Sequence, residues 1–227
     1  MRQILLINPN SSRDTTAMMV EIAQACVPGG IAVIGATATR NPPMIVTAKE
    51  LLAAADEVVE IGVREAAGMS GVIVSAFGDP GLARLRQEIF VPAVGICEAA
   101  MIAAAAGERR FGVATTTPDL AASIAESARE LGLAHLFSGT RLTTGDPVAL
   151  TGDAARLQIA LAKAVEECFE LDHAEAVIIG GGPLGQAAID LARSFQRPII
   201  APIPAALRRL LEIMKSANPD CAALGPG

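Results

Sequence analysis

The residues of this chain with the clearest capacity for chemistry lie in four short segments, each of which follows a run of apolar, often β-branched residues. The segments are residues 8–12, 78–81, 115–119 and 180–183. In three of them a small or capping residue precedes a proline, which suits the first position of a helix because proline has no N–H to leave unpaired. We therefore expect Asp79 and Thr117 to cap the helices that follow them, and Asn10 or Ser11 to cap the first helix.

Helix N-termini placed in this way predict a site for a small anion. Each terminus offers free N–H groups and a partial charge of about +0.5, and open α/β sheets bind ligands beyond the carboxyl ends of their strands. Two facing sets of termini can hold a carboxylate, or the oxyanion of an enolate, without a metal ion. The glycines of residues 180–185 lack the dinucleotide-binding pattern, and no phosphate-binding loop with its lysine is present, so a nucleotide is not expected.

The elements that must position these segments alternate between short apolar runs and longer stretches with helical spacing. The predicted strands cover residues 3–7, 31–36, 71–75, 93–96, 111–114, 176–179 and 198–201, and the predicted helices cover residues 15–26, 48–67, 118–131, 152–169 and 184–195. Continuous apolar strands flanked by helices are typical of a parallel sheet covered on both faces. The fold class is therefore predicted to be α/β.

A weak internal repeat indicates two similar halves. Residues 72–82 and 177–185 share one form, in which a buried strand, a turn of small residues, a proline and a helix follow one another, and their spacing is close to half the chain. We predict two doubly wound parallel-sheet halves with a crevice between them. The first half is assigned to residues 1–97 with 203–227, and the second half to residues 98–202.

The composition of the chain excludes several classes of protein. Of its 227 residues, 52% are hydrophobic and 19% are charged, which argues against a disordered chain. Two histidines make a His-rich metal site unexpected, and a net charge of −6 argues against nucleic acid as a partner. No apolar run approaches the roughly 20 residues of a membrane-spanning helix. The first residues do not match a signal peptide either, so we expect a cytoplasmic protein with reduced thiols and no membrane partner.

Four segments, taken in order, resemble the Asp/Glu/hydantoin racemase superfamily, and most of all its hydantoin and allantoin racemases. They are residues 4–11 (ILLINPNS), 77–82 (FGDPGL), 95–100 (GICEAA) and 114–117 (ATTT). The resemblance implies two similar α/β halves, chemistry without a cofactor, a small-molecule substrate held between the halves, and a homo-oligomer. It also implies two cysteines on opposite faces of the substrate α-carbon, because inversion requires a base on one face and an acid on the other.

This chain departs from that pattern at both cysteine positions. The resemblance aligns the first cysteine with Ala76 and the second with Gly181, and neither residue can move a proton. The two-thiol mechanism therefore cannot be transferred. Cys26 and Cys168 are expected to be buried structural thiols, and Cys221 lies in the polar tail. Serine 75, one residue before the first position, is expected to point away from the direction of residue 76.

Three residues are acid–base candidates, namely Asp79, Glu98 and Cys97, which is expected to end a strand. Asp79 is better suited to be a helix cap than a base, and Glu98 is also suited to cap or orient the helix after it. Thr115, Thr116 and Thr117 are suitable hydrogen-bond donors, Asn8 is suited to donate to a substrate carbonyl, and His135 and His173 are expected at the surface. The predicted substrate-binding residues are Asn8, Ala76, Phe77, Gly78, Thr115, Thr116, Gly180, Gly181, Gly182 and Pro183.

The function predicted from these residues is that of an isomerase. It would act on a small amino-acid-derived or cyclic ureide carbonyl compound, without the usual two thiols and without a cofactor. Two alternatives stay open at this point. One is a hydrolase or lyase that uses a water molecule and an oxyanion hole, and the other is a non-catalytic binder of a small anionic ligand.

Overall fold

The computed structural model describes residues 2–216, which form two parallel four-stranded sheets. The first sheet contains β1 (Arg2–Asn8), β2 (Ile31–Thr37), β3 (Gly71–Val74) and β4 (Ala93–Gly95) in the order β2-β1-β3-β4. The second sheet contains β5 (Phe111–Thr115), β6 (Phe137–Leu142), β7 (Ala176–Ile179) and β8 (Ile199–Ile200) in the equivalent order β6-β5-β7-β8. Both orders are doubly wound, so the predicted α/β fold class is confirmed.

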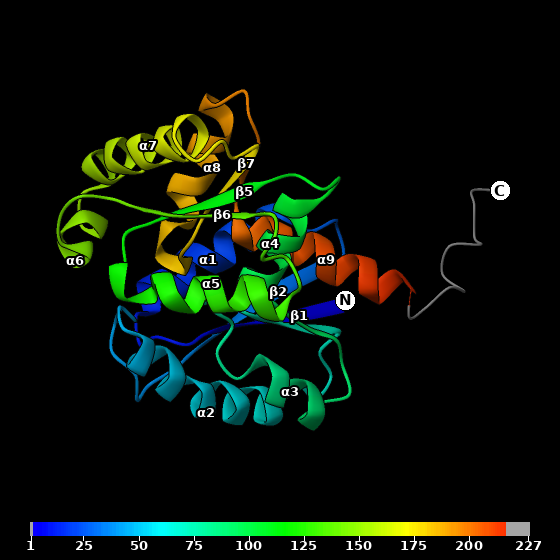
Figure 1. The fold of residues 1–227 in the computed structure, drawn as a ribbon. Helices are drawn as coiled ribbons and strands as arrows, with labels where there is room; N and C mark the ends of the chain where they lie inside the picture. Colours follow the sequence, from blue (N-terminus) through cyan, green and yellow to red (C-terminus); the bar gives the residue numbers. More distant parts are fainter. Residues whose placement is uncertain (1, 217–227) are drawn as a thin grey trace.

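Helices cover both faces of each sheet. In chain order they are α1 (Arg13–Cys26), α2 (Ala48–Glu65), α3 (Leu82–Glu88), α4 (Ile96–Ala105), α5 (Ala121–Glu130), α6 (Pro147–Thr151), α7 (Ala154–Glu170), α8 (Gly185–Ser194) and α9 (Pro202–Ser216), with short 3₁₀ turns at Pro118–Leu120 and Gly182–Leu184. Figure 1 shows α2 and α3 on one outer side, α7 and α8 on the other, and α1, α4, α5 and α9 between the sheets.

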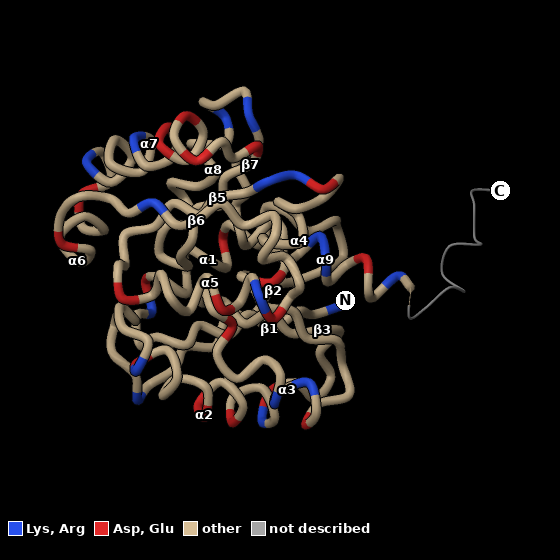
Figure 2. The backbone as a smooth tube through the Cα atoms, in the orientation of Figure 1, with Lys and Arg blue, Asp and Glu red and all other residues tan. Residues whose placement is uncertain are grey.

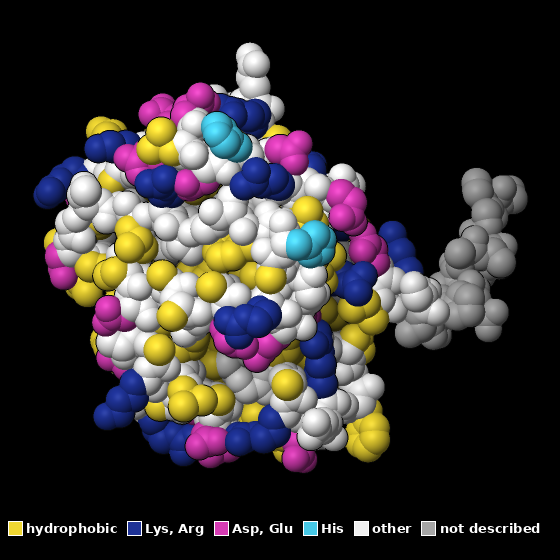
Figure 3. Space-filling model, in the orientation of Figure 1, with side chains coloured by type: hydrophobic (Ala, Val, Ile, Leu, Met, Phe, Trp, Pro, Cys, Tyr) yellow, Lys and Arg dark blue, Asp and Glu magenta, His cyan; other side chains and the backbone are white. Residues whose placement is uncertain are grey.

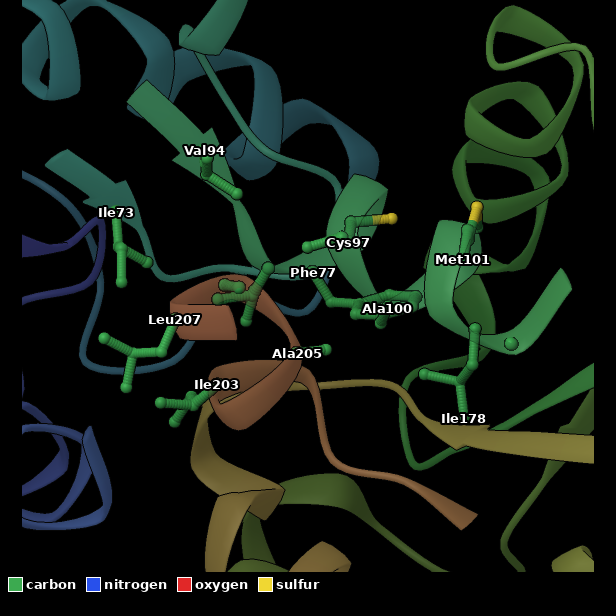
Figure 4. Packing of buried hydrophobic residues seen from close by; sticks show 14 of the residues in the cluster. Ile73, Phe77, Val94, Cys97, Ala100, Met101, Ile178, Ile203, Ala205 and Leu207 are labelled. Carbon is green, nitrogen blue, oxygen red and sulfur yellow. The ribbon is translucent and has the colours of Figure 1, made fainter. Parts of the chain in front are cut away.

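Alternation along the strands explains this layering. Ile4 and Ile73 face the layer between the sheets and join a hydrophobic cluster that also contains Phe111 and Ile178 of the second sheet. Their neighbours along the strands point to the outer faces and form two separate clusters there. Figure 4 shows residues of both sheets, of α4 and of α9 in the central cluster. Each large aliphatic side chain buried there contributes about 1.5–3 kcal/mol.

The helix that follows the last strand of each sheet packs on the other sheet. Helix α4 follows β4 but contacts β5, β7 and β8, whereas α9 follows β8 and contacts β3 and β4. The two helices also pack against each other. The assignment of residues 203–227 to the first half stays a prediction, and residues 217–227, with Cys221, lie outside the described residues.

Three sequence predictions differ from the structure at the level of elements. Strand β6 was not predicted, because it is an edge strand with a mixed sequence and no fully buried residue. Ile96 and Cys97 do not end a strand, since α4 begins at Ile96. Cys26 is exposed rather than buried, because it is the last residue of α1.

The surface shows no concentration of one charge on the face in view. Figure 2 shows acidic and basic residues on the outer helices α2, α3 and α7, and Figure 3 shows them interspersed with hydrophobic side chains. Among the described residues, no helix is both long and apolar enough to cross a membrane.

Candidate functional site

A cavity lies where the carboxyl ends of the two sheets meet. All four strand-end turns contribute to its wall, through Asn10 after β1, residues 75–77 after β3, residues 115–117 after β5 and residues 180–184 after β7. The wall is completed by Met44, Ile45, Leu51, Leu120 and Ile124. The cavity volume is about 50 Å³. None of the residues that line this cavity is Asp, Glu, His, Lys, Arg or Cys.

The turn after β1 is organised by Asn8, which is completely buried. Its amide Nδ2 donates to Asn10 Oδ1 and Thr16 Oγ1, both at 2.9 Å, and its Oδ1 accepts from the Asn10 N–H at 3.1 Å. These contacts occupy the groups that were predicted to bind substrate. Asn8 therefore positions Asn10, which lines the cavity in its place. The cap of α1 is Ser12, whose Oγ accepts from Thr15 N, and not Asn10 or Ser11 as predicted.

The turn after β3 brings Ser75, Ala76 and Phe77 to the cavity wall. The strand ends at Val74, so the alternation that was expected to turn Ser75 away from the direction of residue 76 no longer applies, and both residues line the cavity. Gly78 does not line it, although it was predicted to bind substrate. Within residues 2–216, the main-chain N–H groups of Ala76 and Phe77 have no hydrogen-bond acceptor. They are therefore available to a ligand.

Asp79 caps a helix, but a different one from the helix that was predicted. Helix α3 begins at Leu82 after Gly81, which offers no side-chain cap. The Asp79 carboxylate instead accepts from the N–H groups of Cys97 at 2.9 Å and Glu98 at 2.7 Å, in the first turn of α4. Its burial raises the pKa of this carboxyl to about 7, against the effect of the two hydrogen bonds.

The two other acid–base candidates lie in the same first turn of α4. Cys97 is buried, and burial, together with the nearby Asp79 carboxylate, raises the pKa of its thiol well above the usual value. Glu98 forms an ion pair with Arg86, whose Nη1 lies 3.1 Å from Glu98 Oε2. Asp79, Cys97 and Glu98 are therefore neighbours of one another, but none of them lines the cavity.

The turn after β5 supplies hydroxyl groups. Thr115, Thr116 and Thr117 are all buried and all line the cavity. Thr115 Oγ1 donates to the carbonyl of Gly180 at 2.7 Å and lies 3.3 Å from Thr117 Oγ1. Thr117 stands at the N-cap position of the 3₁₀ turn but makes no capping hydrogen bond. Within the described chain, the N–H groups of Thr116 and Thr117 have no acceptor.

The glycines after β7 allow the two halves to approach closely. A Cβ atom on Gly180 would lie 3.1 Å from the ring of Phe77, and one on Gly182 would lie 2.9 Å from the carbonyl oxygen of Ser75. Gly181 has a φ of 151°, which a side chain would strain. Ala76 and Gly181 are each the second residue after equivalent strands, β3 and β7, and both line the cavity. Gly180, Gly182 and Pro183 line it as well.

A segment that the sequence analysis did not single out closes another side of the cavity. Met44 and Ile45 come from the loop between β2 and α2, where residues 42–45 read Pro-Pro-Met-Ile. The buried Glu57 holds this loop by accepting from Thr39 N at 2.6 Å and Arg40 N at 3.1 Å. Burial disfavours the ionised form of Glu57, but these hydrogen bonds outweigh it and lower its pKa. The apolar pair Met44 and Ile45 within a loop was the sequence feature that could have predicted this part of the cavity wall.

Comparisons with known proteins agree with this architecture. Residues 4–210 match the family model "Asp/Glu/Hydantoin racemase". Hydantoin racemase from Rhizobium meliloti is 30% identical over 206 residues, which are 90% of this chain and 86% of that protein. Hydantoin racemase from Paenarthrobacter aurescens is 27% identical over 91% of this chain and 88% of that protein. Allantoin racemase from Klebsiella pneumoniae shares the fold, with a TM-score of 0.90 at 24% identity over 96% of this chain and 89% of that one. The chain belongs to the Asp/Glu/hydantoin racemase family, as its sequence motifs indicated, and is a racemase-type enzyme.

Proposed function

We propose that this enzyme changes the configuration of a small amino-acid-derived or cyclic ureide carbonyl compound, bound in the cavity between the two halves without a cofactor. The observation that carries this proposal is the convergence of four strand-end turns, two from each sheet, on one cavity. The names of the relatives, hydantoin racemase and allantoin racemase, support the class of substrate.

Two kinds of surface in the cavity support recognition of such a compound. Unpaired N–H groups of Ala76, Phe77, Thr116 and Thr117 can hold carbonyl or carboxylate oxygens. They can also stabilise the oxyanion of an enolate, which forms when an α-proton leaves. The apolar wall of Met44, Ile45, Leu51, Leu120, Ile124 and Leu184 fits a non-polar substituent.

Proton transfer in this cavity differs from the two-thiol pattern. Ala76 and Gly181 carry no ionisable group, and the three acid–base candidates lie outside the cavity lining. We therefore propose that two water molecules act on opposite faces of the α-carbon: one takes the α-proton and becomes hydronium, the other donates a proton to the enolate and becomes hydroxide, and the two ions then neutralise each other. A positioned acid or base usually accelerates such a step about 10²–10⁴-fold, so turnover is expected to be slow.

A second candidate function is non-catalytic binding of the same class of compound. The specific observation in its favour is the absence of any titratable side chain among the residues that line the cavity. A ligand held by N–H groups and threonine hydroxyls needs no acid or base.

Incubation in D₂O distinguishes these functions. Enantiopure 5-isopropylhydantoin and allantoin are followed by NMR for α-deuteration and by chiral chromatography for inversion. We expect α-deuteration and inversion to be faster with the enzyme than without protein. The variant Ala76→Leu, which fills the cavity, should abolish both. Ala53→Leu, at an exposed position of α2, is the matched control and keeps the activity. Ligand-induced NMR shifts without exchange would establish a binder, and ring-opened product would establish a hydrolase.

A further inference from the structure

The structure contains a half-buried carboxylate, that of Asp79, which the proposed reaction does not use. Both of its oxygens accept main-chain N–H groups, Oδ1 from Cys97 and Oδ2 from Glu98. A Cβ atom on Gly95 would lie only 2.0 Å from the Asp79 carboxyl carbon. Position 95 must therefore be glycine for the carboxylate to reach the end of α4.

The backbone around Asp79 adopts conformations that need such an anchor. Asp79 itself has a φ of 48°, and its glycine neighbours at 78 and 81 have values of 122° and 75°. A residue other than glycine in the left-handed region is strained and persists only where surrounding contacts enforce it. Inside the turn, Asp79 N donates to the carbonyl of Ala76 at 3.0 Å. The conformation of Asp79 is thus coupled to Ala76 in the cavity wall.

The helix that Asp79 caps belongs to the interface between the halves. Helix α4 packs on β5 and β7 of the second sheet, and Phe77 lies in the same hydrophobic cluster as Cys97 and Ala100 of α4. Figure 4 shows Phe77 between α4 and residues of α9. The ring of Phe77 in turn limits the space beside Gly180.

We propose that Asp79 is a positioning residue, whose double cap on α4 fixes the turn at residues 76–81 and thereby sets the first-half wall of the cavity. Three charged or titratable groups face its carboxylate, namely Cys97, Glu98 and, through Glu98, Arg86. The effect of the cap on the turn is independent of the reaction. Its effect on ligand affinity rests on the proposed function.

Hydrogen exchange followed by mass spectrometry tests the first part. Asp79→Asn replaces one acceptor with an NH₂ group, and Gly95→Ala displaces the carboxylate while leaving it in the chain. Both variants are expected to speed exchange at least 10-fold in peptides that cover residues 76–82 and the first turn of α4. Asp153→Asn is the matched control, because Asp153 caps α7 by accepting from Arg156 N. It should affect only α7. Unchanged exchange in both Asp79→Asn and Gly95→Ala overturns the proposal.

Affinity for 5-isopropylhydantoin, measured by calorimetry, tests the second part. The wild-type Kd is expected to be several-fold higher at pH 6 than at pH 8, because a protonated Asp79 loses one acceptor. The Asp79→Asn variant should bind about 10-fold more weakly and lose this dependence, whereas Asp153→Asn should keep it. If the wild type binds the hydantoin and the Asp79→Asn variant has the same Kd at pH 6 and at pH 8 as the wild type, the positioning role is contradicted. Altered exchange with no hydantoin binding by any variant contradicts the proposed function alone.

Discussion

The two halves of the molecule repeat one arrangement of strands but secure the start of their last helix in different ways. Five residues after β3 stands Asp79, whose carboxylate accepts N–H groups of α4. Five residues after β7 stands Leu184, which makes no such contact and instead lines the cavity. Helix α9 begins with Pro202 and has Pro204 as its third residue, so two of the N–H groups that a cap would satisfy do not exist.

The free N–H groups at the start of these helices are thus satisfied by a carboxylate in the first half, whereas in the second half prolines remove two of them. The charged solution in the first half depends on protonation, whereas the proline solution in the second half does not. The two halves therefore hold their parts of the cavity wall in different ways. Ala76 and Phe77 depend on a distant cap, while Gly181 and Leu184 depend on local backbone geometry.

The largest expected effect comes from placing the same reactive side chain at the two equivalent positions. Ala76→Cys combined with Gly181→Cys should raise α-proton exchange of a hydantoin by about 10² or more, because each thiol can act as acid or base. NMR in D₂O measures the rate. Cysteine at 181 must leave a φ of 151° and meets Leu184 Cγ at 3.1 Å, so Ala76→Cys alone is the better tolerated control. No gain in the double variant, if it is folded, would refute the equivalence of the two positions.

The second prediction concerns the pH dependence of stability. The pKa of Asp79 is raised from 3.8 to about 7 in the folded protein, so between these values the folded state binds more protons than the unfolded state. The free energy of unfolding must then fall as the pH rises from about 4 to about 7, by at most about 4 kcal/mol. Urea unfolding at pH 5 and pH 8 measures this fall.

Other carboxyl groups act outside this window. The pKa values of Glu50 and Asp172 are lowered, by main-chain hydrogen bonds at Glu50 and chiefly by Arg141 at Asp172. Their contributions are lost only as the pH falls below about 4. Asp79→Asn should therefore remove most of the slope between pH 5 and pH 8. A slope that persists in this variant would place the responsible group elsewhere.

Elements with a strong local pattern could be predicted from the sequence. Apolar runs and helical spacing identified seven of the strands in the described residues, because buried parallel strands are continuous and apolar. They missed β6, an edge strand with polar residues. The four turns were located correctly at strand ends, since small residues and prolines mark them by local chemistry alone.

The roles of individual side chains were harder to predict, because they depend on contacts far apart in the chain. Asp79 looked like a local cap, but its partners at 97 and 98 lie 18 and 19 residues away. Asn8 looked like a substrate contact, but Asn10 and Thr16 use its amide. The domain boundaries, the homo-oligomer and the cytoplasmic location stay predictions.

The third prediction makes the second half resemble the first. Leu184→Asp would place a carboxylate in a buried position, only 2% exposed, and α9 has Pro204 where α4 has the N–H of Glu98. We expect a loss of about 3 kcal/mol in the free energy of unfolding at pH 8, because the charge has fewer hydrogen-bond partners than Asp79 has. The loss should be smaller at pH 5, where the carboxyl is protonated. Equal stability of variant and wild type at pH 8 would show that the two sites are interchangeable.

The smallest expected effects concern the loops that follow the second strand of each half. After β2, the buried Glu57 accepts from Thr39 and Arg40; after β6, the exposed Asp146 caps α6 through Ala149 N. Glu57→Gln should cost about 2 kcal/mol, because buried N–H groups lose a charged acceptor. Asp146→Asn should cost less than about 1 kcal/mol, because asparagine is also a good cap and water can replace the contact. Urea unfolding of both variants at pH 7 checks the order. A reversed order would mean that α6, rather than the Glu57-anchored loop, is the more firmly built side of the cavity entrance, since Thr151 of α6 contacts Met44.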